Sequence, residues 1–349
     1  MSVPAGTPAA ETDRPPARIE RGSAFQMRFL AIWMALVALI LLGAVIVPRS
    51  LLPSTIFAII PLAAFLALTA AGEALVIMAR GIDLSIPAIV TLSSSIILGF
   101  SQGENADLWP AIIVALVFAV AVGAVNGFFV AVFELNALIV TLAVGAITAG
   151  ATLWYREAMP AESRVPPRLA EWGDTRLIGI NLAVWVAVIL LIVLAFILRR
   201  TMIGRRFAAV GANPRAAWVA GITVARYQMA AFAVAAFLYG VAGILLAAFI
   251  RNPTLNVGDP YLLAPIAAAV LGGTAISGGI GSMVAVAGAA LFLTQLGQML
   301  KMLGLSSALQ FVIEGAAIAL GMAMARLDLA PGVAIATASR GRADRSPGG

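Results

Sequence analysis

The chain has 349 residues, of which 62% are hydrophobic and 11% are charged, and its mean hydropathy is +1.03. A soluble domain has about 25% charged residues, so this composition indicates a multi-pass, all-α membrane protein. Cysteine and histidine are absent, which excludes a disulfide framework and makes a membrane protease or oxidoreductase difficult to build. The pI near 10.7 reflects arginines clustered between apolar runs and not a basic face interleaved with aromatic residues, so nucleic-acid binding is not expected.

Ten apolar runs are expected to cross the membrane. Residues 1–28 are polar and proline-rich and are expected to form a disordered tail, as are residues 327–349, which leaves 29–326 as the membrane domain. The second run contains Pro61 and is too long for one straight span, so a kink or break is expected there, and residues 262–281 could also contain a half-helix. The runs cover about 29–47, 53–79, 86–100, 110–133, 136–153, 179–198, 227–250, 262–276, 282–300 and 307–325.

The arginines predict the orientation of these spans. With the N-terminus inside and ten crossings, the inner segments would carry 15 of the 22 basic residues. Since basic residues favour the cytoplasmic side, both termini and residues 199–226 are expected in the cytoplasm, and residues 154–178 in the periplasm.

The turn at residues 80–85 places Asp83 between two apolar runs. Asp83 is expected to cap the helix that begins near Leu84, in preference to a direct contact with a substrate. Glu73 and Arg80 are seven residues apart, so they would share a helix face and could compensate each other in the membrane. Arg80 could instead extend to the cytoplasmic surface.

Residues 199–226 contain six arginines and no acidic residue, between two uncharged apolar runs. Each arginine at the centre of a lipid bilayer would cost about 2.5–3.5 kcal/mol, so this segment must lie outside the membrane. Asn213 and Pro214 can begin a short helix inside it. An ordinary loop that only fixes orientation is the simpler interpretation, but an internal helix carrying Trp218 favours a docking surface for a cytoplasmic protein.

The glycine-rich stretch at residues 272–281 matches only part of a phosphate-binding loop. Its lysine is missing, so we expect no nucleotide binding by this chain. The glycines would instead permit a broken helix or a close turn between spans. Gly123 and Gly127 indicate close helix packing, and Glu314, alone in the last apolar run, could be a proton site or face a water-filled cavity.

Four segments carry the most specific pattern: GEALVIMARGIDLSIPAIVTLS (72–93), NGFFVAVFELNALIVTLAVGAITAG (126–150), GRRFAAVGANPRAAWVAGI (204–222) and AAAVLGGTAISGGIGSMVAVAGAALF (267–292). Together, over roughly residues 70–325, they resemble the ribose-type permeases of binding-protein-dependent ABC importers. The resemblance implies a permease subunit in the bacterial inner membrane that translocates a monosaccharide. It also implies three partners: a second permease subunit, a periplasmic substrate-binding protein and a separate cytoplasmic ATPase, which alone would bind ATP. The permease itself would be no enzyme and would hold no cofactor or metal.

The resemblance also assigns roles to residues. Residues 213–222 would be a coupling helix that enters a cleft on the ATPase. The coupling-loop candidates are Gly204, Gly211, Asn213, Pro214, Ala216, Ala217, Gly221 and Ile222. Candidates for structure or the translocation path are Glu73, Gly81, Asp83, Ser85, Asn126, Gly272, Gly273, Gly278, Gly279 and Glu314.

Several departures from the family pattern leave the substrate open. Glu73 and Arg80 stand where the family usually has uncharged residues, and Leu263-Ala264-Pro265 replaces a usual acidic pair. An importer permease for branched-chain amino acids or nucleosides is one alternative. A stand-alone carrier that uses Glu73, Asp83 or Glu314 as an ion site is another. The permease pair would be a homodimer or a heterodimer.

Overall fold

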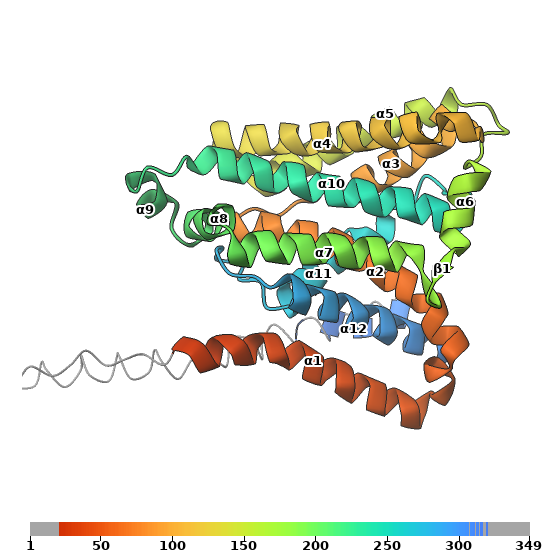
Figure 1. Ribbon diagram of the computed structural model, residues 1–349, viewed down its shortest axis with the longest axis horizontal. Helices are drawn as coiled ribbons and strands as arrows, with labels where there is room; N and C mark the ends of the chain where they lie inside the picture. The colour runs from red at the N-terminus through yellow and green to blue at the C-terminus, as the bar shows by residue number, and fades with distance from the viewer. Residues whose placement is uncertain (1–20, 307, 311, 314, 317–318, 320–349) are drawn as a thin grey trace, which may run out of the picture.

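The computed structural model describes residues 21–306, 308–310, 312, 313, 315, 316 and 319. These residues form a helical bundle with one small antiparallel hairpin, β1 (Arg176–Leu177) and β2 (Ile180–Asn181) (Figure 1). Seven described helices are long and apolar enough to cross a membrane, which takes about 20 residues. They are α1 (Arg21–Ile46), α2 (Pro53–Met78), α4 (Leu108–Val132), α5 (Ala137–Glu157), α7 (Leu182–Arg200), α10 (Val224–Ile250) and α12 (Met283–Met302).

The remaining helices are shorter. Two of them are apolar, α3 (Ile86–Ser101) and α11 (Ala264–Leu271), and each is preceded by an irregular segment. The others connect the long helices: α6 (Pro167–Asp174), α8 (Met202–Ala212), α9 (Pro214–Val219) and the 3-10 turns η1 (Pro48–Leu51), η2 (Asn105–Asp107) and η3 (Asp259–Tyr261).

The structure corrects two expectations about the ends of elements. Helix α2 is continuous through Pro61, and the interruption falls after Met78, in a linker over residues 79–85. Pro61 lies in the interior of α2, where it removes the one backbone hydrogen bond that its N–H would have donated, and the helix continues through it. Helix α1 already begins at Arg21, inside the segment expected to be a tail. Most of the last expected span (307–325), Glu314 and residues 327–349 lie outside the described residues.

Helices α2 and α10 form the centre of the bundle. Helix α10 packs against α2, α3 and α4, and α2 also packs against α7, α11 and α12. The predicted close packing at Gly123 and Gly127 is confirmed. A Cβ atom on Gly123 would lie 2.5 Å from the Phe232 carbonyl oxygen, and one on Gly127 would lie 2.8 Å from the Met229 Cα. Small residues therefore let α4 and α10 approach at backbone distance.

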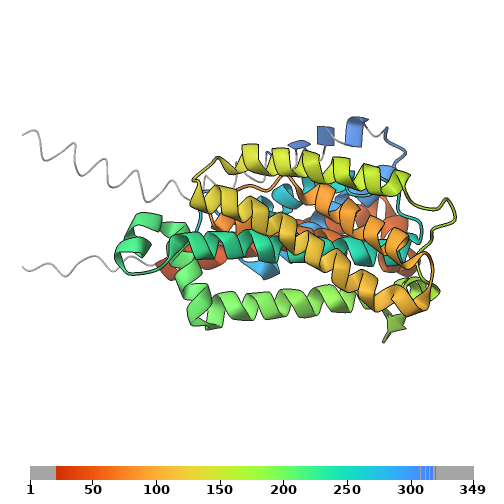
Figure 2. The same cartoon turned by 90° about the horizontal axis from the view of Figure 1, so that it is seen from above.

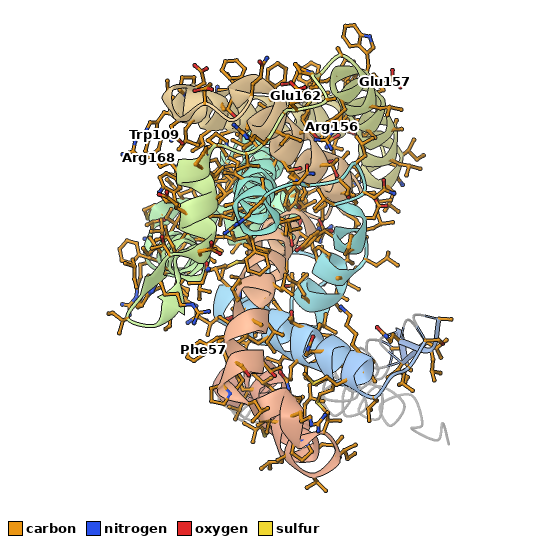
Figure 3. All side chains as sticks on the ribbon, turned by 90° about the vertical axis from the view of Figure 1, so that its right-hand side faces the viewer. Phe57, Trp109, Arg156, Glu157, Glu162 and Arg168 are labelled. Carbon is orange, nitrogen blue, oxygen red and sulfur yellow. The ribbon has the colours of Figure 1, made fainter. Side chains whose placement is uncertain are left out.

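The connectors gather at two opposite ends of the bundle. Helices α8 and α9 lie at one end, here called the α9 end, and α6 with the hairpin lies at the other, here called the α6 end (Figures 1 and 2). Figure 3 looks onto the α6 end, where Arg156 donates a hydrogen bond to the Pro253 carbonyl at 2.8 Å. Trp109 packs on Trp172 there with ring centroids 5.6 Å apart, which ties α4 to α6.

Candidate functional site

Polar caps shape the segment at the α9 end. The Thr201 hydroxyl accepts a hydrogen bond from the Gly204 amide at 3.2 Å and starts α8, and the Asn213 side chain accepts from the Ala216 amide at 3.1 Å and starts α9. Pro214 occupies the first turn of α9, where its missing N–H costs nothing. The short helix predicted after Asn213 is therefore confirmed.

Helix α9 presents apolar side chains to its surroundings. Trp218 is 72% exposed and Val219 is 79% exposed. Ala217, a coupling candidate, is only 4% exposed and faces the inside of the protein. The alanine therefore supports the fold of α9, and the two residues after it form the exposed surface. Gly221 turns the chain back toward α10 with a positive φ of 78°.

The glycine-rich stretch packs directly against α8. The Gly279 amide donates to the Met78 carbonyl at 2.9 Å, and a Cβ atom on Gly211 would lie 2.0 Å from the same carbonyl oxygen. Gly278 and Gly279 have positive φ angles of 91° and 78°, which glycine adopts without steric cost. The end of α8, the end of α2 and this turn thus meet at backbone contact, as the expected close turn requires.

Arg80 joins the same three segments. Its Nε donates to the Gly211 carbonyl at 2.7 Å and its Nη2 to the Ala212 carbonyl at 2.8 Å. The residue has a positive φ of 71°, a conformation that costs a non-glycine residue about 1–2 kcal/mol. The hydrogen bonds to the last carbonyls of α8 offset this cost.

The expected compensation between Glu73 and Arg80 is wrong. Within the part of the chain that the structure describes, the single ion pair joins Arg251 and Asp174. After Met78 the chain leaves the helix, so the two side chains do not share a helix face. Arg80 turns toward α8, and Glu73 stays inside the bundle.

Glu73 belongs to a buried polar cluster. The Asp83 amide donates to both carboxylate oxygens of Glu73 at 3.3 Å, and the Tyr239 hydroxyl donates to Glu73 Oε2 at 3.3 Å. All three residues are fully buried. Since a buried polar group without partners is costly, these bonds fix the end of the linker against α2 and α10.

Asp83 supports the linker and does not cap helix α3. Its Oδ1 accepts from the Ser85 amide at 2.8 Å and from the Ser85 hydroxyl at 2.6 Å, while α3 begins at Ile86. The carboxylate therefore closes a local turn in front of the helix. Asn126 of α4 donates to the Ser85 hydroxyl at 2.9 Å, which brings four candidates, Glu73, Asp83, Ser85 and Asn126, into one cluster.

Two members of this cluster had not been predicted. Thr141 of α5 accepts a hydrogen bond from the Leu84 amide at 3.0 Å, and Tyr239 of α10 contacts Glu73. A tyrosine in the middle of an apolar helix is the available signal, because a buried tyrosine hydroxyl usually has a polar partner. Threonine at a helix position gives no comparable signal, since it often bonds to its own backbone.

Other candidate glycines serve local packing. Gly204 lies against the backbone of Leu198, and Gly272 against the backbone of Val286. Gly273 has a positive φ of 81° at the end of α11, and Gly81 is enclosed by Phe232 and Val76. These positions shape the backbone near the buried polar cluster and near the contact between α8, the end of α2 and the glycine turn, and they make no polar side-chain contact in either.

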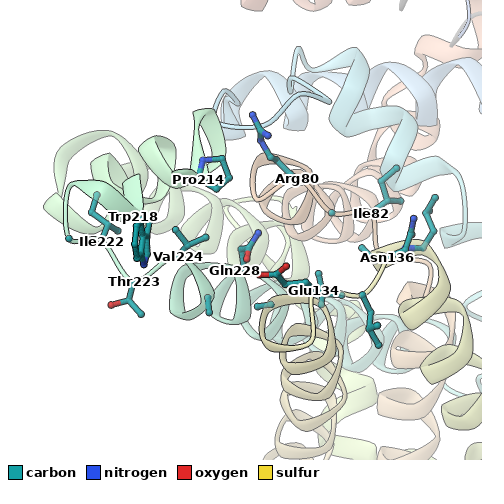
Figure 4. Close-up of a pocket in the computed structure, with 18 residues that line it drawn as sticks. Arg80, Ile82, Glu134, Asn136, Pro214, Trp218, Ile222, Thr223, Val224 and Gln228 are labelled. Carbon is teal, nitrogen blue, oxygen red and sulfur yellow. The ribbon is translucent and has the colours of Figure 1, made fainter. Parts of the chain in front are cut away.

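A pocket of about 850 Å³ opens between the linker, α9 and the turn that joins α4 to α5 (Figure 4). Its lining includes Gly81, Glu134, Trp218, Ile222 and Gln228. In Figure 4 the Arg80 side chain points away from Glu134 and Gln228. Among the described residues, no group of three or more acidic, histidine or cysteine side chains could hold a metal ion.

The fold and these connections define a multi-pass helical membrane protein with a structured segment at one end. Residues 55–323 match the family described as branched-chain amino acid transport system / permease component, and the chain belongs to this family. It is thus a permease component of the bacterial inner membrane.

The similar proteins are named as permeases. The ribose import permease protein RbsC of Escherichia coli K12 is 30% identical over 83% of this chain and 91% of its own length. RbsC of Bacillus subtilis strain 168 is 31% identical over 86% of this chain and 93% of its own. The L-arabinose ABC transporter permease protein AraH of Azospirillum brasilense is 27% identical over 88% and 91%, respectively. No solved structure matches the chain.

Proposed function

We propose that this chain is the membrane-spanning subunit of an ATP-driven ABC importer that translocates a monosaccharide. The relatives are named for ribose import and for L-arabinose transport, which supports this substrate class. The family description names branched-chain amino acids, so an amino-acid importer is the competing assignment. A periplasmic binding protein would deliver the substrate, and a second permease subunit would complete the path.

The α9 end is the cytoplasmic end in this proposal. Between residues 29 and 306 this end carries Arg80 and the six arginines of residues 199–226 against one acidic residue, Glu134. The segments of the α6 end, with the η3 loop counted among them, carry seven basic and seven acidic residues. Cytoplasmic loops are enriched in arginine, so the asymmetry supports this orientation. Ten crossings follow if α3 and α11 each complete a crossing with their preceding segments and one further span follows α12.

The exposed face of α9 is the observation that carries the proposal. A loop that only connects two spans and fixes their orientation has no need of a capped helix that exposes Trp218 and Val219 beside arginines. Such a surface fits a protein partner, since tryptophan and arginine dominate binding energy at interfaces. The partner would be the separate ATPase that binds ATP, while the permease itself makes no covalent change to its cargo.

The transport step would follow from motion of α9. ATP-driven closure of two ATPase subunits would displace the two coupling helices, and the spans would reorient around a path between the two permease subunits. The buried bonds between the linker and helices α2, α4, α5 and α10 would keep these helices together during the movement.

Replacing the exposed tryptophan tests the docking surface. Trp218→Ala should weaken association with the ATPase at least tenfold, about 1.4 kcal/mol, because a large exposed contact is removed. The measurement is titration of the detergent-solubilised permease with the ATPase of the same transport system. Trp154→Ala is the matched control, because Trp154 is 76% exposed and lies on α5, close to the α6 end. Equal affinities for both variants would reject α9 as the docking element.

Reconstitution into vesicles distinguishes an ATP-driven importer from a stand-alone carrier. Vesicles that hold the permease, its ATPase and its binding protein should take up sugar only when ATP is present. Uptake by vesicles that contain the permease alone would overturn the proposal.

A further inference from the structure

The linker over residues 79–85 is attached to two different parts of the molecule. Its first half bonds to the α8–α9 segment through Arg80. Its second half bonds to the buried cluster through Asp83, Leu84 and Ser85. The Thr141 hydroxyl also donates to the Ile82 carbonyl at 3.3 Å. Only Gly81 therefore separates the two attachments, and the linker is the short connection between the α9 end and the interior of the bundle.

The attachment at Arg80 is built to resist displacement. The guanidinium binds two successive carbonyls at the end of α8, where the helix leaves its last carbonyls without internal partners. The stem of Arg80 packs on the glycine turn, because a Cβ atom on Gly278 would lie 2.6 Å from Arg80 Cγ. A movement of α8 toward or away from the bundle must therefore move Arg80.

The attachment at the other side reaches several membrane helices. The Asp83 amide is bonded to Glu73 of α2, the Leu84 amide to Thr141 of α5, and the Ser85 hydroxyl to Asn126 of α4. These bonds lie in a fully packed environment, where a shift of one partner strains the others. A displacement of the linker is thus shared among at least three helices.

We infer that Arg80 is a positioning residue that transmits movement of the α8–α9 segment, through the linker, to the buried cluster of Glu73, Asp83, Ser85 and Asn126. The inference rests on the proposed function, in which an ATPase moves α9. Trp218 would receive the movement, and Arg80 would pass it inward. Loss of Arg80 would then leave ATPase docking intact and separate ATP hydrolysis from transport.

Arg80→Asn is the variant that tests this role. Asparagine tolerates the left-handed backbone at this position but is too short to reach the α8 carbonyls. In vesicles with the ATPase and the binding protein, the number of sugars transported per ATP hydrolysed should fall at least fivefold. Affinity for the ATPase should stay within twofold of the wild-type value. Arg80→Lys, which keeps the charge and the reach, should recover part of the transport per ATP.

Arg49→Asn is the matched control, because Arg49 is an exposed arginine at the α6 end, and its transport per ATP should match the wild type. Unchanged transport per ATP in Arg80→Asn would overturn the inference. So would an equal fall of transport and hydrolysis, because that indicates a structural role only.

A measurement on the unaltered protein covers the case in which Arg80→Asn does not fold. Hydrogen exchange at the amides of Asp83, Leu84 and Ser85 should change at least threefold when the assembled complex is trapped with ATP. Unchanged exchange at these amides would overturn the inference while leaving the proposed function standing. A permease that binds no ATPase at all would instead reject the proposed function.

Discussion

Individual oxygen atoms decide how the linker is held. Asp83 uses only Oδ1 for its two bonds to Ser85, and the buried Oδ2 has no hydrogen-bond partner among the described residues. A neutral side chain with one acceptor oxygen would therefore keep both bonds. It would also remove the desolvation cost of a buried carboxylate.

The two side-chain oxygens of Asp83 differ in what their loss would cost. Asp83→Ala should destabilise the detergent-solubilised protein by about 1–3 kcal/mol, because the Ser85 amide and hydroxyl both lose their acceptor. Asp83→Asn should cost less than about 1 kcal/mol, since its amide oxygen can take the place of Oδ1. Thermal unfolding of both variants is the measurement. Asp107→Ala, at an exposed aspartate on η2, is the control. Equal destabilisation by Asn and Ala at residue 83 would contradict the network described here.

At this scale the sequence indicates which residues are unusual but not which ones meet. Charges in apolar runs correctly drew attention to Glu73, Asp83 and Arg80. Their partners come from α4, α5 and α10, far along the chain, and depend on how the helices are rotated. The apparent pairing of Glu73 with Arg80 failed for a local reason, because the helix ends between them.

The helices at the α9 end approach each other closely because glycine stands at their contact. Helix α8 lies so close to α2 that only glycine fits at residue 211. Alanine is otherwise the better helix former there, by about 1 kcal/mol. Destabilisation by alanine at this position would therefore come from packing, because the change in helix propensity acts in the opposite direction.

Gly211→Ala should destabilise the protein by about 1–3 kcal/mol, despite the gain in helix propensity, because the new methyl group would lie 2.0 Å from the Met78 carbonyl oxygen. Gly150→Ala in α5 is the matched control, since no atom lies within 4 Å of a Cβ atom placed there. It should be neutral or stabilising. Chemical unfolding in mild detergent measures both. A neutral Gly211→Ala would mean that α8 does not pack on α2 as described.

The helices themselves were largely predictable. Their apolar runs are long, and asparagine or threonine caps mark several of their starts, as at Asn136, Asn181 and Thr201. Breaks were harder to place. Pro61 is a strong breaker by residue type, but α2 continues through it. The real interruption after Met78 depends on the contacts of Arg80 and Gly279.

The whole molecule is asymmetric in charge, and this asymmetry carries its proposed orientation. The arginine-rich α9 end and the mixed-charge α6 end lie at opposite ends of the long helices. Each arginine or lysine near the anionic cytoplasmic membrane surface contributes about 1 kcal/mol of attraction. The arginines of the α9 end therefore act together in favour of the cytoplasmic side. Because the chain lacks cysteine, a single introduced thiol reports its own side without background.

Ala216→Cys on α9 should react with a membrane-impermeant maleimide only from the cytoplasmic side. Ala161→Cys, in the segment before α6, should react only from the periplasmic side. Both alanines are exposed, so accessibility is set by the membrane and not by burial. Right-side-out and inside-out vesicles of cells that express each variant give the two measurements, and the cysteine-free protein gives the background. Labelling of Ala216→Cys from the periplasmic side would reverse the orientation and remove α9 from reach of any cytoplasmic ATPase.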